Sequence, residues 1–263
     1  MTQIDKSRFE WIGSDSARRE GISRPSTTFW KDAIGRLMKN KVAVVCFFII
    51  VLLILSCIIV PFFSPFESRE QHLGEVNKGF MTVCTDSRYE GQHHVHYFGT
   101  DNLGRDLFLR AFEGGRVSLM IAFAAVFVNL IVGLIYGGIS GYIGGAVDTI
   151  MMRIVEIVNG IPYLIVVILL MMVLPKGIFT MVVAYGITGW TGMARLVRGQ
   201  VLQLKSQEYI VAAEAMGAKS SRIIAKHLIP NALSVIIINV TLAIPSAIFT
   251  EAFLSYIGLG VPV

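Results

Sequence analysis

Five stretches of the sequence are rich in apolar residues and contain no Asp, Glu, Lys or Arg. They cover residues 42–66, 117–147, 157–175, 177–194 and 228–250. At about 1.5 Å per residue, even the shortest would extend roughly 27 Å as a helix, close to the ~30 Å hydrocarbon thickness of a bilayer. The pattern therefore predicts an all-α polytopic membrane protein with five spans.

Two of these runs are expected to depart from one straight helix. The run at 117–147 is longer than a bilayer requires, so its Gly-rich end is expected to lie beyond the hydrocarbon. The helix of the run at 157–175 is expected to start earlier, near Asp148, and Pro162 is a candidate bending point.

Clusters of positive charge orient the predicted spans. Residues 1–41 carry nine Lys and Arg against five Asp and Glu, and residues 195–227 carry six against two. Because positive charge collects on the cytoplasmic side, both segments are predicted to be cytoplasmic. Alternation then places residues 64–116 outside.

Upstream of the first span, an amphipathic pattern predicts a short helix in the inner headgroup layer. Its apolar residues recur at helical spacing among cations: Trp30, Ile34, Leu37 and Met38. The predicted organisation is a flexible cytoplasmic tail at 1–28, this interfacial helix at 29–41, a first span at 42–63, an extracytoplasmic loop at 64–116, and a core at 117–263 with a cytoplasmic loop at 200–230.

Composition agrees with a membrane protein and excludes other classes. Hydrophobic residues make up 54% of the chain and charged residues only 16%, which is too apolar for a soluble domain. Cys46, Cys57 and Cys84 form no paired spacing, so no disulfide framework is predicted. No basic face with interleaved aromatic residues is present, and we predict no nucleic-acid partner.

The sequence contains no motif for catalysis. It has no P-loop, no HExxH and no GxSxG, so no catalytic residue and no ATP site are predicted in this chain. The centres of the spans also lack the ionisable groups that ion-driven transporters keep there. If the protein moves a solute uphill, a separate motor subunit must supply the energy.

One cluster of histidines in the outer loop could bind a metal. It comprises His93, His94 and His96, with His72 and Asp101 in the same loop. Imidazoles at this spacing can ligate a transition metal, but solvated loops often carry histidines without that role. We therefore predict no metal site.

A ridge of small residues lies on the second span. Gly133, Gly137, Gly141 and Gly145 are spaced by four, which stacks them on one helix face and lets another helix approach closely. Packing within the chain is favoured over a homodimer contact.

The cytoplasmic loop from Ser206 to Asn231 predicts two short helices joined at Gly217. Ser206 is expected to cap the first and Ser220 the second. Gly217 is expected to supply a left-handed turn, and Pro230 to close the second helix.

The first of these helices has one face of mostly small residues: Tyr209, Ala212, Ala213 and Met216. Such a face suits insertion into a groove on a partner. The alternative, which composition alone favours, is an interfacial helix resting on lipid or on its own bundle.

The loop resembles the EAA motif of binding-protein-dependent ABC import permeases. Ala212, Ala213, Gly217 and Pro230 match with the full spacing kept, whereas Val211, His227 and Ile229 depart from the pattern. In its details the loop is similar to the dipeptide, oligopeptide and nickel branch. The resemblance assigns contact with an ATPase to Glu208, Tyr209, Ala212, Ala213, Glu214, Met216, Gly217, His227 and Pro230.

A second stretch resembles the entry into the second span of the C-type subunit of those permeases. Its matching residues are Gly99, Thr100, Asp101, Gly104, Arg105, Asp106 and Arg110. Asp101 is expected to cap a helix that carries the ion pairs Asp101–Arg105 and Asp106–Arg110. The stretch either positions the next span or contacts substrate.

The resemblance implies a type I ABC importer permease bundle in a bacterial inner membrane. The implied partners are a second homologous permease, two ATPase subunits that bind ATP and Mg²⁺, an extracytoplasmic substrate-binding protein and the lipid bilayer. Family members have six spans, whereas five are predicted before Val263, so either this sequence lacks the last helix or this version is shorter.

The cargo and the role leave alternatives open. Peptides are the expected cargo, and nickel, glutathione or another small solute are the alternatives within the resemblance. A membrane scaffold that holds an ATPase without moving solute, or a passive channel, are the alternatives outside it.

Overall fold

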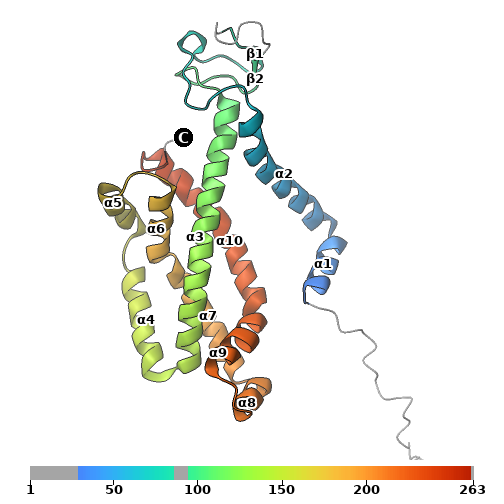
Figure 1. Ribbon diagram of the computed structural model, residues 1–263, viewed down its shortest axis with the longest axis vertical. Coiled ribbons are helices and arrows are strands. Elements are labelled where there is room, and N and C mark those ends of the chain that lie inside the picture. Colours follow the sequence, from blue (N-terminus) through green and yellow to red (C-terminus); the bar gives the residue numbers. More distant parts are fainter. Residues whose placement is uncertain (1–28, 86–93, 262–263) are drawn as a thin grey trace, which may run out of the picture. The chain divides into compact units, whose positions relative to one another are not determined.

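The computed structural model describes residues 29–85 and 94–261 (Figure 1). The chain divides into two compact units, Met1–Leu52 and Leu53–Val263. The helices are α1 (Phe29–Lys39), α2 (Lys41–Phe63), α3 (Leu107–Ile143), α4 (Gly145–Asn159), α5 (Tyr163–Val173), α6 (Ile178–Thr188), α7 (Trp190–Lys205), α8 (Glu208–Ala215), α9 (Ser220–Ile223) and α10 (Ile229–Tyr256). Between them lie a 3-10 turn, η3 (Leu73–Glu75), a π-helical segment, η5 (Ile224–Leu228), and two antiparallel two-residue strands, β1 (Thr82–Val83) and β2 (Val95–His96).

The first two helices lie close to their predicted bounds. After Lys41, α2 contains no charged residue, and its 23 residues span about 34 Å, enough to cross the hydrocarbon. In α1, the apolar residues Ile34, Leu37 and Met38 are exposed. The tail predicted at 1–28 lies outside the described residues.

The second long helix, α3, begins earlier than predicted. It starts at Leu107 rather than at residue 117 and runs for 37 residues, about 55 Å, so it extends well beyond a bilayer. The side chain of Asp106 caps it by accepting a 2.7 Å hydrogen bond from the Leu109 amide. Residues 107–116, the last of the predicted loop at 64–116, are therefore helical.

Helix α3 is the centre of the bundle and packs most extensively on α7, then on α10 and α6. A β-carbon added to Gly137 would lie 2.3 Å from the carbonyl oxygen of Ala194 on α7. Gly133 and Gly141 also face α7 at close range, so the glycine ridge packs within this chain. Gly145 does not belong to it: this residue begins α4 with a φ of +56°, and a β-carbon there would meet nothing within 4 Å.

The predicted span at 157–175 is wrong as one helix. The segment consists of the end of α4 and all of α5, which are bent by 74° relative to each other. The break lies at Gly160–Pro162, where the proline cannot continue the hydrogen-bond ladder of the preceding helix. Helix α4 also begins at Gly145, slightly before the expected start near Asp148.

The predicted span at 177–194 is also interrupted. Helix α6 ends at Thr188, and α7 begins at Trp190 after Gly189. The 11 residues of α6 reach only about 17 Å. Within the described residues, three helices are long and apolar enough to cross a membrane, and the α4–α5 pair would make a fourth. The chain is thus a multi-pass helical membrane protein, but it does not show five uninterrupted spans.

The last span is continuous with the loop before it, so Pro230 does not close a helix there. Residues Ser220–Tyr256 form one helical stretch with the π-helical turn η5 directly before the proline. A proline clashes with the carbonyl four residues earlier in an α-helix. The wider π turn, closed by the bond from the Ile229 amide to the Ile224 carbonyl, relieves that clash.

Candidate functional site

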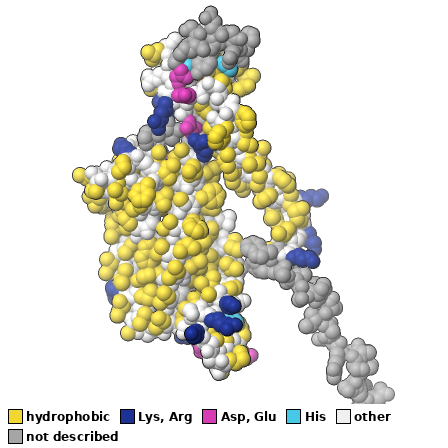
Figure 2. Space-filling model, in the orientation of Figure 1, with side chains coloured by type: hydrophobic (Ala, Val, Ile, Leu, Met, Phe, Trp, Pro, Cys, Tyr) yellow, Lys and Arg dark blue, Asp and Glu magenta, His cyan; other side chains and the backbone are white. Residues whose placement is uncertain are grey.

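The candidate site is the end of the bundle formed by α8, the turn at Gly217 and α9. Hydrophobic side chains cover the flank of the bundle, and Lys and Arg side chains gather over α8 and α9 (Figure 2). The exposed cations of this end include Lys219, Arg222 and Lys226. A polar end on an apolar bundle is expected where the chain leaves the bilayer.

The start of α8 is not capped by a side chain. Gln207 is the N-cap residue and makes no side-chain cap bond, whereas Ser206 donates from its hydroxyl to the Gln203 carbonyl at 3.2 Å. The predicted Ser206 cap is therefore wrong. The predicted Ser220 cap is wrong as well, because Lys219 precedes α9 and Ser220 lies inside it.

The turn that ends α8 agrees with its prediction. Gly217 has a φ of +77°, and the Ala218 amide donates to the Ala213 carbonyl at 3.1 Å. This is the left-handed helix ending that glycine adopts without steric cost. A β-carbon at Gly217 would meet no atom within 4 Å, so the backbone conformation alone favours glycine here.

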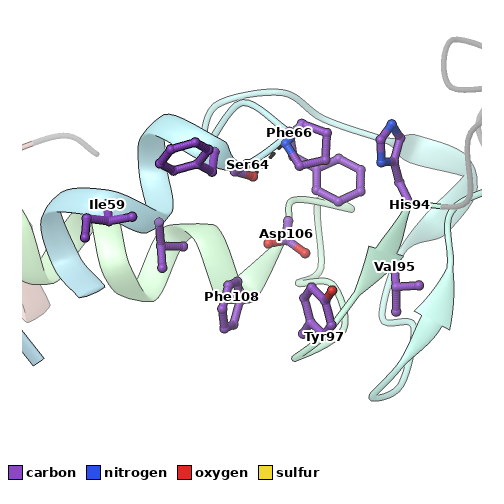
Figure 3. A pocket seen from close by; sticks show the side chains of 11 residues that line it. Ile59, Ser64, Phe66, His94, Val95, Tyr97, Asp106 and Phe108 are labelled. Atoms are coloured by element: carbon purple, nitrogen blue, oxygen red, sulfur yellow. Dashed lines mark hydrogen bonds between the residues drawn. The ribbon is translucent and has the colours of Figure 1, made fainter. Parts of the chain in front are cut away.

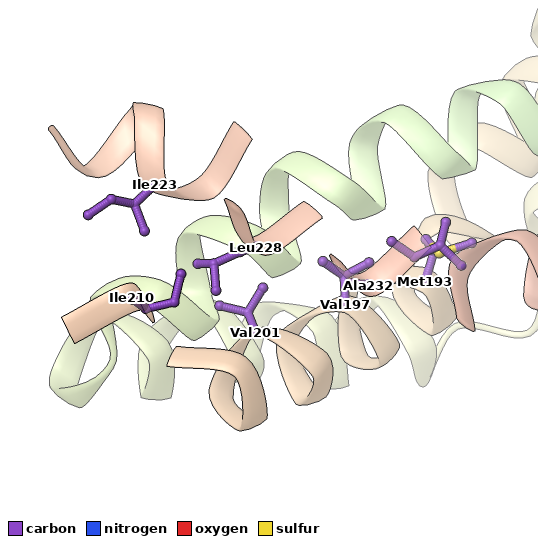
Figure 4. Close-up of a cluster of buried hydrophobic side chains, with 8 residues drawn as sticks. Met193, Val197, Val201, Ile210, Ile223, Leu228 and Ala232 are labelled. Carbon is purple, nitrogen blue, oxygen red and sulfur yellow. The ribbon is translucent and has the colours of Figure 1, made fainter. Parts of the chain in front are cut away.

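The inner face of α8 is seated on the bundle. Ile210 is fully buried and Ala213 is 6% exposed. Ile210 lies beside Val201 of α7, Ile223 of α9 and Leu228 of η5 (Figure 4). The cluster continues along α7 and α10 through Met193, Val197, Ala232 and Ile236. The inner face of α8 thus belongs to the same buried cluster as residues of α7 and α10.

The outer face of α8 is open. Met216 is 81% exposed, Val211 55% and Tyr209 42%, and Ala212 is also exposed. The predicted face was partly wrong, because Ala213 points inward beside Ile210. The remaining three residues of that face form a small, mostly apolar surface around Ala212.

Polar contacts tie α8 to the end of α3. The hydroxyl of Tyr142 donates to Glu214 at 3.0 Å. Lys205 donates to the Tyr142 carbonyl and lies 5.1 Å from the centre of its ring. Next to this contact, Arg198 of α7 holds Asp148 of α4 through two hydrogen bonds. These partners come from separate helices, and no sequence spacing predicts them.

The remaining residues predicted to contact an ATPase lie at the same end. Glu208 is exposed in the first turn of α8, and Pro230 is exposed in the first turn of α10. His227 is half-buried, and its carbonyl accepts a hydrogen bond from Asn231 at 2.6 Å. Of the predicted set, Ala213 alone is buried.

The second predicted motif forms a tight structure before α3. Asp101 accepts hydrogen bonds from the Leu103 and Arg105 amides at 2.8 and 2.9 Å, and pairs with the Arg105 side chain. Burial would raise the pKa of Asp101, but its hydrogen bonds from Arg105 lower it. Asp101 therefore caps a turn, and Asp106 rather than Asp101 caps the helix.

The predicted Asp106–Arg110 pair is not formed. Asp106 is bonded to His96, 2.8 Å from Nδ1. Arg110 instead donates to the Ser68 carbonyl at 3.3 Å and lies 4.0 Å from Asp101. Its contacts join the start of α3 to the loop that follows α2.

Gly99, Thr100 and Gly104 hold the loop strands together. A β-carbon at Gly104 would lie 2.0 Å from the carbonyl oxygen of His72, and both glycines have positive φ. Thr100 accepts from the Lys78 amide at 2.9 Å and donates to the Glu75 carbonyl. All these contacts are internal, so the motif positions α3 and its loop.

The rings of His72, His94 and His96 all pack around Phe66, with ring centres 4.4–6.2 Å from the centre of its ring. His93 lies outside them. His94 lines a pocket of about 460 Å³ together with Ile59, Phe66, Tyr97 and Phe108 (Figure 3). Asp101 pairs with Arg105. His96 is fully buried and meets Asp106 and Glu75, the latter 3.0 Å from Nε2.

Comparison with known proteins gives the family. Residues 129–263 match the family described as "Binding-protein-dependent transport system inner membrane component". Residues 28–79 match the "N-terminal TM domain of oligopeptide transport permease C". The two matches cover the core and the first span separately.

Similar proteins cover almost the whole chain. It is 48% identical to the oligopeptide transport system permease protein OppC of Bacillus subtilis, over 100% of this chain and 82% of that protein. It is 47% identical to the dipeptide transport system permease protein DppC of the same organism, over 92% of this chain and 72% of that protein. OppC of Escherichia coli is 42% identical over 98% of this chain and 81% of its own length.

Proposed function

Because this chain belongs to the family of binding-protein-dependent transport system inner membrane components, we propose that it is one of two permease subunits in an ATP-driven peptide importer. In this proposal it lies in a bacterial cell membrane with its amino terminus in the cytoplasm. Its partners are a homologous permease, two ATPase subunits and an extracytoplasmic substrate-binding protein. The ATPases bind ATP and Mg²⁺, and this chain has no catalytic role of its own.

The observation that carries the proposal is that α8 has one buried face and one exposed face. Its inner face is fixed by Ile210 and Ala213, while Tyr209, Ala212 and Met216 are exposed. A short helix with an exposed apolar face and a small central residue suits a groove on a partner. A bulkier residue in place of Ala212 would hold the helix out of such a groove.

The same packing provides the path for coupling. Closure of the ATPases would displace α8, and Ile210 would carry the displacement to α7 and α10. The Tyr142–Glu214 bond would carry it to α3. A membrane scaffold for an ATPase would need the exposed face but not these connections, so the connections favour transport.

The names of the similar proteins favour peptides as cargo. Relatives from several bacteria are named as oligopeptide or dipeptide transport permeases. Nickel is the alternative weighed from the sequence. Selectivity for peptide length would reside in the substrate-binding protein, since the apolar centres of the spans offer few groups for tight binding.

The test is the variant Gly217→Val in the reconstituted complex of all subunits. A β-branched side chain at a φ of +77° strains the turn by about 1–3 kcal/mol and displaces α8. We expect the variant to assemble and hydrolyse ATP while uptake of labelled peptide in proteoliposomes falls at least tenfold.

The matched control is Gly258→Val at the other end of α10. Gly258 has a φ of +82° and, like Gly217, no atom within 4 Å of an added β-carbon, so the strain is comparable while α8 is untouched. Equal losses of uptake in the two variants, or normal uptake with Gly217→Val, would refute the coupling role.

Cross-linking tests the location of α8. The variant Met216→Cys should cross-link to an ATPase subunit, whereas Phe80→Cys, at a position that is 78% exposed, should not.

A further inference from the structure

The segment between α2 and α3 has an unusually polar core. In the part of it that the structure describes, the regular structure is η3 and two strands of two residues each. Among the described residues, the buried hydrophobic cluster here consists of Phe66, Cys84 and Leu109, the last from the first turn of α3. The buried polar residues are more numerous: Ser68, His72, Glu75, His96, Thr100 and Asp106. Small units with so little apolar core usually depend on a covalent or metal cross-link.

Three metal-ligand side chains meet inside this core. The carboxylate of Glu75, the sulfur of Cys84 and a ring nitrogen of His96 all lie within 4.8 Å of one another, and all three residues are buried. They come from η3, from the residue after β1 and from β2. From these positions we propose that Glu75, Cys84 and His96 bind a divalent transition-metal ion of the zinc type.

The outer contacts hold each ligand in a suitable orientation. Asp106 lies 2.8 Å from Nδ1 of His96, the carboxylate contact that commonly directs the other ring nitrogen toward a metal. The His96 ring also stacks on Phe66 at 4.4 Å. Nε2 therefore points to Glu75 Oε2, 3.0 Å away.

The two carboxylate oxygens of Glu75 have different partners. Oε1 accepts hydrogen bonds from the amide and the hydroxyl of Thr85. Oε2 faces His96. Cys84 is held from the opposite strand, because its amide donates to the His94 carbonyl at 2.8 Å. The carboxylate is thus prepared for monodentate coordination.

The dimensions and the chemistry of the donors agree with zinc. Bonds of about 2.0–2.3 Å place the ligand atoms of a tetrahedral zinc site roughly 3.2–3.8 Å apart. The ligand atoms of Glu75, Cys84 and His96 are now up to 4.8 Å apart. Each side chain would have to shift by less than about 1 Å to reach the tetrahedral separations. The three donors are one nitrogen, one sulfur and one oxygen, a set that suits zinc. Mg²⁺ and Ca²⁺ are excluded because they prefer oxygen ligands.

The experiment uses the full chain, purified in detergent with an affinity tag that contains no histidine and stripped with a chelator. Zn²⁺ is titrated against a chromophoric chelator, and Co²⁺ serves as the spectroscopic probe. We expect about one equivalent of Zn²⁺ per chain and a thiolate-to-cobalt charge-transfer band. Folded wild-type protein that binds no Zn²⁺, or binds Co²⁺ without that band, would overturn the proposal.

Variants identify the ligands. Cys84→Ser should abolish the cobalt band and His96→Gln the stoichiometric binding, while the exposed Cys46→Ser and the distant His227→Gln keep both. Asp106 is a positioning residue, and Asp106→Asn should weaken Zn²⁺ binding by about 10–100-fold, whereas Asp101→Asn should not. Full binding by Cys84→Ser would mean that other loop histidines hold the ion, and would also overturn the proposal.

Discussion

Replacing Gly137 with alanine tests the close approach of α3 and α7. A β-carbon at Gly137 would lie 2.3 Å from the carbonyl oxygen of Ala194 and 2.9 Å from the β-carbon of Val197. Because β-carbons essentially never come within 3.0 Å of another heavy atom, α7 must shift by at least about 0.7 Å against a packed interior. The obstacle is backbone, which no rotamer change can move.

The magnitude follows from two opposing contributions. Overpacking of this kind costs about 1–3 kcal/mol, and glycine-to-alanine replacement within a helix gains about 0.5–1 kcal/mol. Gly137→Ala should therefore lower the free energy of unfolding by up to roughly 2 kcal/mol. The neighbouring Gly138→Ala should raise it by about 0.5–1 kcal/mol, because its β-carbon would meet only Ile224, at 3.4 Å.

Thermal unfolding in detergent, followed for both variants and the wild type, gives the comparison. For a chain of this size 1 kcal/mol corresponds to about 2–4 °C in Tm, so the two variants should differ by several degrees and lie on opposite sides of the wild type. An increase in Tm for Gly137→Ala equal to that of Gly138→Ala would refute the close approach of α3 and α7 at Gly137.

Two more predictions concern the polar contacts. Tyr142→Phe removes the hydrogen bond to Glu214, worth about 0.5–1.5 kcal/mol, and should reduce peptide uptake per ATP hydrolysed in proteoliposomes; an unchanged ratio would exclude this bond from the coupling path. The folded-state pKa of Asp101 is lowered, so its stabilising effect is full above the ordinary pKa of about 4 and is lost as pH falls through the folded value. Tm measured from about pH 6 to pH 3 should therefore fall more steeply for the wild type than for Asp101→Asn, and parallel curves would contradict the assignment.

The apolar runs located the membrane segments but not the breaks within them. A run without charges indicates that a segment can lie in the bilayer. Whether that segment forms one continuous helix depends on single residues such as Pro162 and Gly189. The start of α3 could not be read from the apolar run either. Its first three turns carry Arg110, Glu113 and Arg116, because this part of the helix lies beyond the apolar segment.

The short helix α8 was predicted from the sequence, but the side on which it packs was not. Helical spacing grouped Tyr209, Ala212, Ala213 and Met216, and the structure adds Ile210 as the buried anchor of α8. Periodicity alone cannot decide which side of a short helix faces its own bundle. The surroundings of His96 could not be predicted, because its partners are Glu75, 21 residues earlier, and Asp106, 10 residues later. Only the turns between them bring these side chains together.

The packing of the bundle constrains how transport can proceed. At Gly137, the backbone of α3 lies close against the backbone of α7. Arg198 of α7 holds α4 through Asp148. Ile210 seats α8 on α7, α9 and η5. A displacement of α8 therefore cannot separate these helices without breaking close packing, which is more costly than moving them together. In the proposed complex, the bundle should turn as one body against the second permease, as in rigid-body switching at a subunit interface, and the pathway should open between the two subunits rather than through this chain.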